Sequence, residues 1–438
     1  MPTRVNGVLQ LYHRDFGADA STVSEHIGSF ARHSKFRVWE VNTLFEIPPQ
    51  LWSLRFSVVL LHYSLFGPGA YYHLDEEYLR YLAEACGESY KVAFFQDEYR
   101  FCGLRFAFLN QYDVDCVFSC LEPPYLDEVY GRHTSVSKLV STLPGYVSAD
   151  LVESSRRFQQ PEGEREVDIG YRGRLLPAYT GRGGLEKYEV GVRFARRAAS
   201  LGLELDIAWG EDDRLYGDDW YRFIAGCRAV LGTESGVSVF DLEGEVHREY
   251  QALVETGREV TLEQLERGAL GRWEGRIPYR TLSPRHFEAA ALGVCQILYE
   301  GRYSGAIEPL VDYIPLKKDF SNFDEVIERF RDDDLRRELT DNARRRLIDS
   351  GEFGYGSLIR VFDETLLTAG LQPGSSPADE RKVEKALERG SARRYVRARL
   401  WSLNDALRRT DVPGKAALRA VARPALRAID RRRRRLHA

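Results

Sequence analysis

The stretch FSVVLLHYSLFGPGAYYHLDEEYLRYLAEACGESYKVAFF, residues 56–95, decides the fold class of this chain. It opens with a short apolar run, FSVVLL, and closes with a second one, KVAFF, both of strand length. Between them, DEEYLRYLAEACG repeats its apolar residues with a helical period and stops at Gly87. A strand, a helix and a second strand in this order predict a parallel sheet with crossover helices.

The same alternation continues on both sides of this stretch. GVLQLY and DCVFS predict further strands in the first part of the chain, and STVSEHIGSFARH predicts a helix. After a looser polar segment, VDIGYRG, LELDIAW and CQILY predict strands of a second series, with GLEKYEVGVRFARRAASLG as its long helix. We therefore expect an α/β protein with two Rossmann-like domains, residues 1–150 and 167–370, facing across a cleft, and a basic helical tail at residues 381–438.

Composition restricts the class of protein. The chain has 438 residues, 43% of them hydrophobic, which is enough for two domains with apolar cores. No apolar run approaches the roughly 20 residues that span a bilayer, and the first residues lack the order of a signal peptide. We therefore expect a cytoplasmic protein. The six cysteines are spread through apolar segments, which predicts reduced core thiols rather than a metal site.

Charge is divided unevenly along the chain. Residues 381–438 hold 19 Lys/Arg and 5 Asp/Glu, a net charge of +14, which leaves −18 for residues 1–380 because the whole chain carries −4. In this tail, four apolar residues recur at helical spacing between arginines: Val396, Leu400, Leu403 and Leu407. A basic amphipathic helix suits an anionic membrane surface, and it equally suits packing on the acidic body of the same chain. No aromatic and basic platform accompanies the tail, so we do not expect a nucleic acid partner.

Polar side chains follow three predicted strands of the first domain. His13 follows GVLQLY, His62 follows FSVVLL, and Asp97 and Glu98 follow KVAFF. Because ligands bind beyond the carboxyl ends of parallel strands, we expect these side chains to project into one cleft. A histidine or a carboxylate there could take a proton from a substrate hydroxyl, which makes His13, His62 and Asp97 the candidate catalytic residues, with Glu98 beside them. The alternative for each histidine is a buried structural role.

A glycine-rich segment, YRGRLLPAYTGRGGLEK at residues 171–187, joins a predicted strand to a predicted helix. Glycines at a helix start let backbone N–H groups approach a phosphate, and arginines neutralise the phosphate with paired donors. The pattern predicts a diphosphate site formed by Arg172, Gly173, Arg174, Arg182 and Gly183. The alternative is an ordinary glycine-rich turn with solvated arginines.

The segment SPRHFEAAALG, residues 283–293, predicts a two-turn helix that carries one carboxylate, Glu288, among alanines. Ser283 suits the N-cap and Pro284 the first helical position. In one interpretation Glu288 pairs with Arg285 on a solvated face. In the other, Glu288 accepts hydrogen bonds from the two hydroxyl groups of a vicinal diol such as ribose, because a carboxylate has two acceptor oxygens, and Arg285 is expected to bind the same ligand.

Two further polar segments, each containing glycine, lie at the ends of predicted strands of the second domain. They predict either ligand-binding donors or ordinary turns. The residues concerned are Ser235, Gly236, Ser304 and Gly305. No Asp-x-Asp pair points to a diphosphate held through a metal. We therefore expect chemistry without a metal or a cofactor, in which arginines and a helix dipole stabilise the leaving group.

FEAAALG with the preceding SPR, the strand exit YRGRL and the closing helices of the second series resemble the C-terminal domain of GT-B glycosyltransferases. The nearest pattern is that of the group-1 and CgeB-like (spore-protein-like) transferases, and the resemblance is strongest over the predicted second domain. It implies a GT-B architecture in which Glu288 binds the ribose of a nucleotide-sugar donor. It also implies that Gly173 and Arg174 belong to the loop that grips the donor diphosphate, and that Arg182 stands where the family has lysine.

The activity that this resemblance implies is transfer of a sugar, of the hexosyltransferase type, from a nucleoside diphosphate sugar to a hydroxyl of a glycan or lipid-linked saccharide. Cell-surface polysaccharide biosynthesis at the inner face of the membrane is the implied setting. One position departs from the pattern, because retaining members carry a glutamate where this chain has Arg280. Either Glu274 or Glu234 holds the sugar, or the enzyme inverts, or catalysis is lost. A non-catalytic GT-B-like structural protein of an envelope or coat is therefore the rival, and a nucleotide-sugar epimerase is the third alternative.

Overall fold

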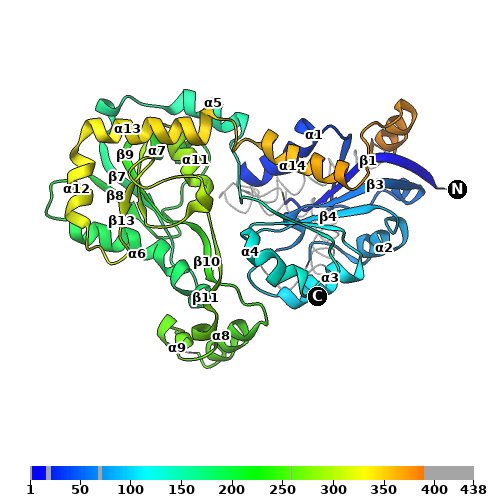
Figure 1. The fold of residues 1–438 in the computed structure, drawn as a ribbon, viewed down its shortest axis with the longest axis horizontal. Helices are drawn as coiled ribbons and strands as arrows, with labels where there is room; N and C mark the ends of the chain where they lie inside the picture. The colour runs from blue at the N-terminus through cyan, green and yellow to red at the C-terminus, as the bar shows by residue number, and fades with distance from the viewer. Residues whose placement is uncertain (1, 16–20, 68–71, 258, 389–438) are drawn as a thin grey trace, which may run out of the picture.

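The computed structural model describes residues 2–15, 21–67, 72–257 and 259–388, and it contains two lobes, each built on a parallel sheet (Figure 1). The stretch at residues 56–95 folds as the sequence predicts, into β3 (Leu54–Leu61), α2 (Glu76–Ala85) and β4 (Tyr90–Phe94). Asp75 begins the helix, because its side chain accepts hydrogen bonds from the backbone N–H groups of Glu77 and Tyr78. β3 and β4 then pair in parallel, so the predicted α/β class is confirmed.

The first sheet has the strand order β2-β1-β3-β4-β5-β6, and every neighbouring pair is parallel. Its other strands are β1 (Thr3–Tyr12), β2 (Val38–Asn42), β5 (Cys116–Ser119) and β6 (Lys138–Ser141). The helices of this domain, besides α2, are α1 (Ser21–His33), α3 (Cys102–Gln111) and the short α4 (Pro123–Leu126).

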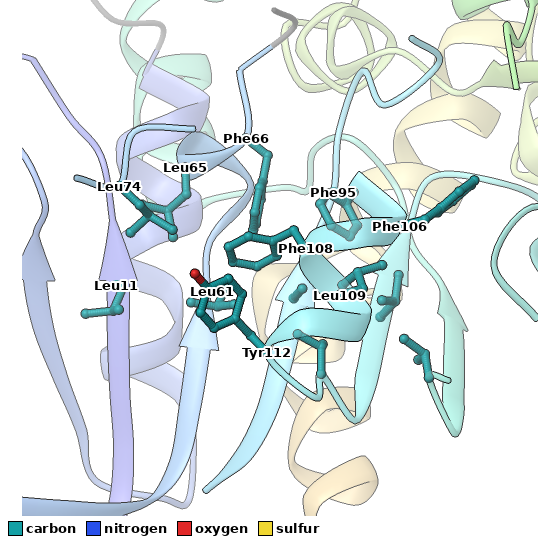
Figure 2. Packing of buried hydrophobic residues seen from close by; sticks show 14 of the residues in the cluster. Leu11, Leu61, Leu65, Phe66, Leu74, Phe95, Phe106, Phe108, Leu109 and Tyr112 are labelled. Carbon is teal, nitrogen blue, oxygen red and sulfur yellow. The ribbon is translucent and has the colours of Figure 1, made fainter. Parts of the chain in front are cut away.

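Side chains of the first sheet alternate between two apolar layers, as expected for strands that are buried on both faces. Leu11 and Leu61 belong to the layer that α2 and α3 cover, where Phe66, Phe108 and Tyr112 pack on one another (Figure 2). The opposite layer packs against α1. Packing of these two layers holds the strands in register, and this fixes where the ends of the strands lie.

The second sheet has the order β13-β12-β9-β7-β8 and is also parallel. Its strands are β7 (Val167–Arg172), β8 (Leu205–Ala208), β9 (Cys227–Gly232), β12 (Cys295–Tyr299) and β13 (Ile314–Leu316). Its helices are α5 (Ala149–Phe158), α6 (Gly181–Ala198), α7 (Asp218–Ala225), α11 (Pro284–Ala291), α12 (Phe323–Arg331) and α13 (Asp333–Arg344). The two predicted Rossmann-like domains are therefore present.

Residues 235–281 form a bridging insertion between the two domains. Its antiparallel strands are β10 (Ser235–Val239) and β11 (Glu274–Thr281), and between them lie α8 (Glu245–Glu255), α9 (Leu262–Glu266) and α10 (Ala269–Trp273). The insertion contacts the first domain, because the rings of Phe101 and His247 lie 4.6 Å apart and Asp241 N–H donates to the Tyr99 carbonyl at 2.8 Å.

The chain returns to the first domain at α14 (Tyr355–Thr368), which lies beside α1 (Figure 1). Phe362 and Ile359 of α14 join the apolar layer that contains Phe30 of α1, and Asp363 accepts a hydrogen bond from Ser34 at 2.6 Å. α14 lies inside the range 167–370 that the sequence assigns to the second domain, yet it packs on the first sheet. The physical reason is its apolar face, which completes the first core.

The beginning of the predicted tail is ordered on the first domain, since Val383 and Ala386 are buried in its core. The amphipathic stripe predicted further along the tail lies outside the described residues. All six cysteines are free and buried. Among the helices that the structure describes, none is both long and apolar enough to cross a membrane.

Candidate functional site

The carboxyl ends of the two sheets face each other at the junction of the domains. Glu122, just after β5, and Arg302, just after β12, form an ion pair across this junction at 2.7 Å. Parallel α/β sheets bind ligands at this edge, so the junction is where the predicted site residues can meet.

Glu288 lies on α11, which begins at Pro284 after the N-cap Ser283. The alanines around it are buried, whereas Glu288 itself is half-buried. Its Oε2 accepts a hydrogen bond from Trp220 Nε1 at 2.7 Å. Burial raises the pKa of Glu288, although the Trp220 bond and the Arg285 charge oppose this rise. Glu288 therefore lies in a partly desolvated, polar environment rather than on a fully solvated helix face.

Arg285 does not form the predicted alternative pair with Glu288. Its guanidinium lies over the Trp220 ring at 5.0 Å and donates to the Arg172 carbonyl. The side chain remains exposed at the junction, where it can meet an anion.

The predicted diphosphate residues at the end of β7 do not all face the junction. Arg172 turns back to its own sheet, where it pairs with Asp206 at 2.8 Å and covers the Phe223 ring at 4.0 Å. It therefore holds β8 rather than facing the junction. Gly173 permits close packing, because a Cβ there would lie 2.6 Å from the Lys187 carbonyl oxygen. Arg174 is exposed and makes no ion pair within the described part of the chain.

Side chains of the bridging insertion accept hydrogen bonds from backbone N–H groups at the start of α6. Gly183 N–H donates to Ser238 Oγ at 2.7 Å, and Arg182 N–H donates to Glu274 Oε2 at 3.1 Å. The Arg182 guanidinium pairs with Glu266 at 2.8 Å. The predicted phosphate donors of this helix start are thus already used by the protein, and Glu274 acts as a cap.

Lys187, one turn further along α6, is a junction residue that the sequence does not predict. Its Nζ donates to the Gly236 carbonyl at 2.6 Å. Burial lowers the pKa of Lys187 to about 8, Asp97 counteracts the change, and Arg280, Arg174 and Arg285 add to it. Lys187 is the last residue of the segment GRGGLEK, and this position is a signal for it, although the resemblance places Arg182 at the family's lysine.

Arg280 forms an internal charge network where the resemblance expects a glutamate. It pairs with Glu186 at 2.5 Å and with Glu234 at 3.4 Å, and Glu186 also binds Lys318 at 2.8 Å. Glu234 Oε1 in addition accepts the backbone N–H of Tyr303 at 2.9 Å. Glu234 is therefore committed to the protein, and the network balances the positive charge of Arg280.

Of the remaining predicted donor residues, Ser235 and Gly236 lie on β10, and Ser304 and Gly305 lie in a turn after β12. Gly236 has φ +85, and a Cβ there would overlap the Tyr279 carbonyl. Ser235 is part of β10, opposite Thr281. Ser304 and Gly305 are exposed and have φ values of +54 and +71, and Ser304 Oγ bonds Thr281 Oγ1 at 2.9 Å.

The histidines of the first domain are engaged with one another. His62 is fully buried, with Nε2 2.9 Å from His26 Nδ1 and Nδ1 bonded to Ser64. Burial lowers the pKa of His62 far below its ordinary value and that of His26 to about 3. His13 stacks on His73 with ring centroids 4.0 Å apart. The structural alternative therefore fits His62 better than a role as general base.

Asp97 and Glu98 follow β4 and differ in exposure. Asp97 keeps solvent contact, has a left-handed backbone with φ +57, and donates its N–H to Tyr279 Oη at 3.1 Å. Desolvation by the surrounding domains raises its pKa, which Lys187 and Arg174 oppose. Glu98 is fully buried and accepts from Tyr279 Oη at 2.5 Å and from Ser119. Of the two, Asp97 is the carboxylate that a substrate can reach.

Five residues thus meet at the junction and are called the junction cluster: Asp97, Arg174, Lys187, Arg285 and Glu288. Two carboxylates with raised pKa values stand among three cations, an arrangement suited to an anionic ligand that also carries hydroxyl groups. Among the described residues, no group of three or more His, Cys, Asp or Glu side chains is placed to hold a metal ion. The individual roles of the predicted residues stay predictions.

No family model matches this sequence, and no curated protein matches it. Several solved structures are similar in fold. An alpha-glucosyltransferase in complex with UDP-glucose and DNA containing an abasic site is 11% identical, with a TM-score of 0.46 over 83% of this chain and 100% of the other. A glycosyltransferase from Rickettsia africae is 11% identical, with a TM-score of 0.45 over 83% and 97%. HepE from Anabaena in complex with UDP is 10% identical, with a TM-score of 0.42 over 83% and 100%.

Proposed function

We propose that this protein is a glycosyltransferase that transfers a sugar from a nucleoside diphosphate sugar to a hydroxyl of a glycan or lipid-linked saccharide. The observation that carries the proposal is the junction cluster, in which a half-buried carboxylate on α11 and three cations face an accessible carboxylate of the first domain. These are the groups that a ribose, a diphosphate and an acceptor hydroxyl require.

In the proposed reaction, Glu288 accepts hydrogen bonds from the ribose hydroxyls, and Arg174, Lys187 and Arg285 bind the diphosphate. The acceptor oxygen attacks the anomeric carbon while Asp97 takes its proton, and the bond from that carbon to the phosphate oxygen breaks. The nucleoside diphosphate leaves with the electron pair, and the three cations stabilise the charge that develops on it. The raised pKa of Asp97 supports this role, since a raised pKa makes a carboxylate a better base near neutral pH.

The wider setting belongs to the same proposal. Metal independence, cell-surface polysaccharide as the product and a cytoplasmic position at the inner face of the membrane rest on the resemblance and on the net charge of the tail. A specific observation favours the rival, a non-catalytic structural protein, because Arg280 replaces the family's glutamate and is neutralised by Glu186 and Glu234.

Titration with UDP, GDP, ADP and dTDP, followed by the thermal midpoint, tests the proposal. Binding at 100 times Kd stabilises a protein by about 2.7 kcal/mol, which shifts a melting curve visibly. We expect one nucleotide to raise the midpoint of the wild type and of the control Glu328→Ala, whose side chain is exposed on α12, but not of Glu288→Ala. Absence of a shift with all four would contradict the proposal and favour the structural rival. Conversion of a nucleotide sugar without an acceptor would instead identify an epimerase.

A further inference from the structure

One side chain, Trp220 of α7, contacts both charged groups of α11 at the junction. The edge of the indole donates its Nε1–H to Glu288 Oε2 at 2.7 Å, and the face of the same ring carries the Arg285 guanidinium at 5.0 Å. Phe223, one turn along α7, lies against Trp220 with ring centroids 5.7 Å apart. The indole is therefore held in place by packing, and it contacts two groups of opposite charge.

We infer that Trp220 is a positioning residue, which orients the Glu288 carboxylate so that the site selects ribonucleotides over 2′-deoxyribonucleotides. This inference rests on the proposed function and extends it to the sugar of the nucleotide.

The hydrogen bond restricts how the carboxylate can turn. An indole N–H is a donor only, so it can hold just one carboxylate oxygen, and that oxygen is Oε2. Oε1 has no hydrogen-bond partner among the described residues. With Oε2 held, the plane of the carboxylate is set, and both oxygens keep lone pairs for two neighbouring hydroxyl groups. A ribose presents two such hydroxyls, whereas a 2′-deoxyribose presents one.

The partial burial of Glu288 increases the importance of the Trp220 hydrogen bond for the orientation of the carboxylate. Glu288 is half-buried, and no basic side chain pairs with it among the described residues, because Arg285 is drawn onto the indole face. A carboxylate in such surroundings depends on the few donors that reach it, and a charge-assisted bond is stronger than a neutral one. Loss of the indole N–H would leave the carboxylate free to rotate, and the geometry that two hydroxyls require would no longer be prepared.

The substitution Trp220→Phe separates the two contacts. Phenylalanine keeps an aromatic face for Arg285 and for Phe223 but has no N–H for Glu288. Trp273→Phe is a matched control, because Trp273 Nε1 also donates to a glutamate, Glu245 Oε2 at 3.1 Å, within the bridging insertion. Both variants remove one indole–carboxylate bond, and only one of the bonds lies at the junction.

The experiment measures Kd by calorimetry for three matched pairs: UDP and 2′-deoxy-UDP, GDP and 2′-deoxy-GDP, ADP and 2′-deoxy-ADP. For the pair that binds, we expect the wild type and Trp273→Phe to prefer the ribonucleotide by about tenfold, the value of one hydrogen bond to a charged group. In Trp220→Phe the ratio of the two Kd values should fall toward one, because only the ribonucleotide binds more weakly. Glu288→Gln should lose the preference as well, and it replaces Trp220→Phe if that variant does not fold.

Three outcomes are distinct. An unchanged preference in Trp220→Phe overturns the positioning role and leaves the proposed function intact. Equal weakening of both members of the pair also overturns it, because that result indicates general structural damage. Failure of the wild type to bind any of the six nucleotides overturns this inference, and the proposed function falls with it if dTDP also leaves the thermal midpoint unchanged.

Discussion

Replacement of Tyr279 by phenylalanine would remove a single hydroxyl group that links the bridging insertion to the first domain. This hydroxyl is buried, donates to Glu98 Oε2 at 2.5 Å and accepts the N–H of Asp97 at 3.1 Å. In the variant, Glu98 keeps the Ser119 hydroxyl as its side-chain donor, and the Asp97 amide loses its acceptor. A hydrogen bond to a charged group contributes about 1.5–3 kcal/mol, and an unsatisfied amide adds to the loss. We expect the free energy of unfolding to fall by about 3 kcal/mol.

The pH dependence of this loss follows from the raised pKa of Glu98. A carboxyl with a raised folded-state pKa contributes most stability below its ordinary pKa, and that stability is lost as the pH rises through the folded value. The hydroxyl of Tyr279 opposes the rise, so the variant raises the pKa of Glu98 further. The deficit of Tyr279→Phe should therefore be larger at neutral pH than at acidic pH.

Urea denaturation at two pH values, followed by circular dichroism, measures the deficit. The control is Tyr299→Phe, since Tyr299 is equally buried but its hydroxyl has no partner among the described residues. Removal of an unpaired buried hydroxyl should be nearly neutral or slightly stabilising. If Tyr279→Phe proves no more destabilising than Tyr299→Phe, the Tyr279 hydroxyl does not stabilise the contact between the bridging insertion and the first domain.

Two further predictions concern the junction. Gly183→Ala should destabilise the protein by about 1–3 kcal/mol, because its Cβ would overlap Arg280 Nη1 and lie 2.9 Å from Ser238 N. Gly103→Ala, in a helix with nothing within 4 Å, should instead stabilise by about 0.5–1 kcal/mol, and equal effects in urea denaturation would refute the steric argument. The affinity for a nucleoside diphosphate should fall about tenfold between pH 7 and 9, because Lys187 has a pKa of about 8 and attracts the anion only when protonated. Calorimetry should show a flat profile for Lys187→Met, and equal slopes in the two proteins would exclude Lys187 from the site.

Local patterns of the sequence account for the elements that these experiments depend on. The apolar runs and the amphipathic helix within residues 56–95 predict β3, α2 and β4, and the Ser283 and Pro284 pair predicts the start of α11 with Glu288 on it. These features depend on neighbours within a few residues, so they can be read without knowledge of the rest of the chain.

The partners of the charged side chains were decided by the tertiary structure alone. Glu288 meets Trp220 across 68 residues, Arg172 meets Asp206 across 34, and the N–H of Arg182 meets Glu274 across 92. The sequence does not distinguish an arginine that faces a ligand from one that turns back to its own sheet. The direction of the side chain depends on the acceptor that folding brings near it, and that acceptor comes from a distant element. The sequence alone therefore determined the two parallel sheets and the helix that carries Glu288, and the packing of the bridging insertion decided which residues remain available at the junction.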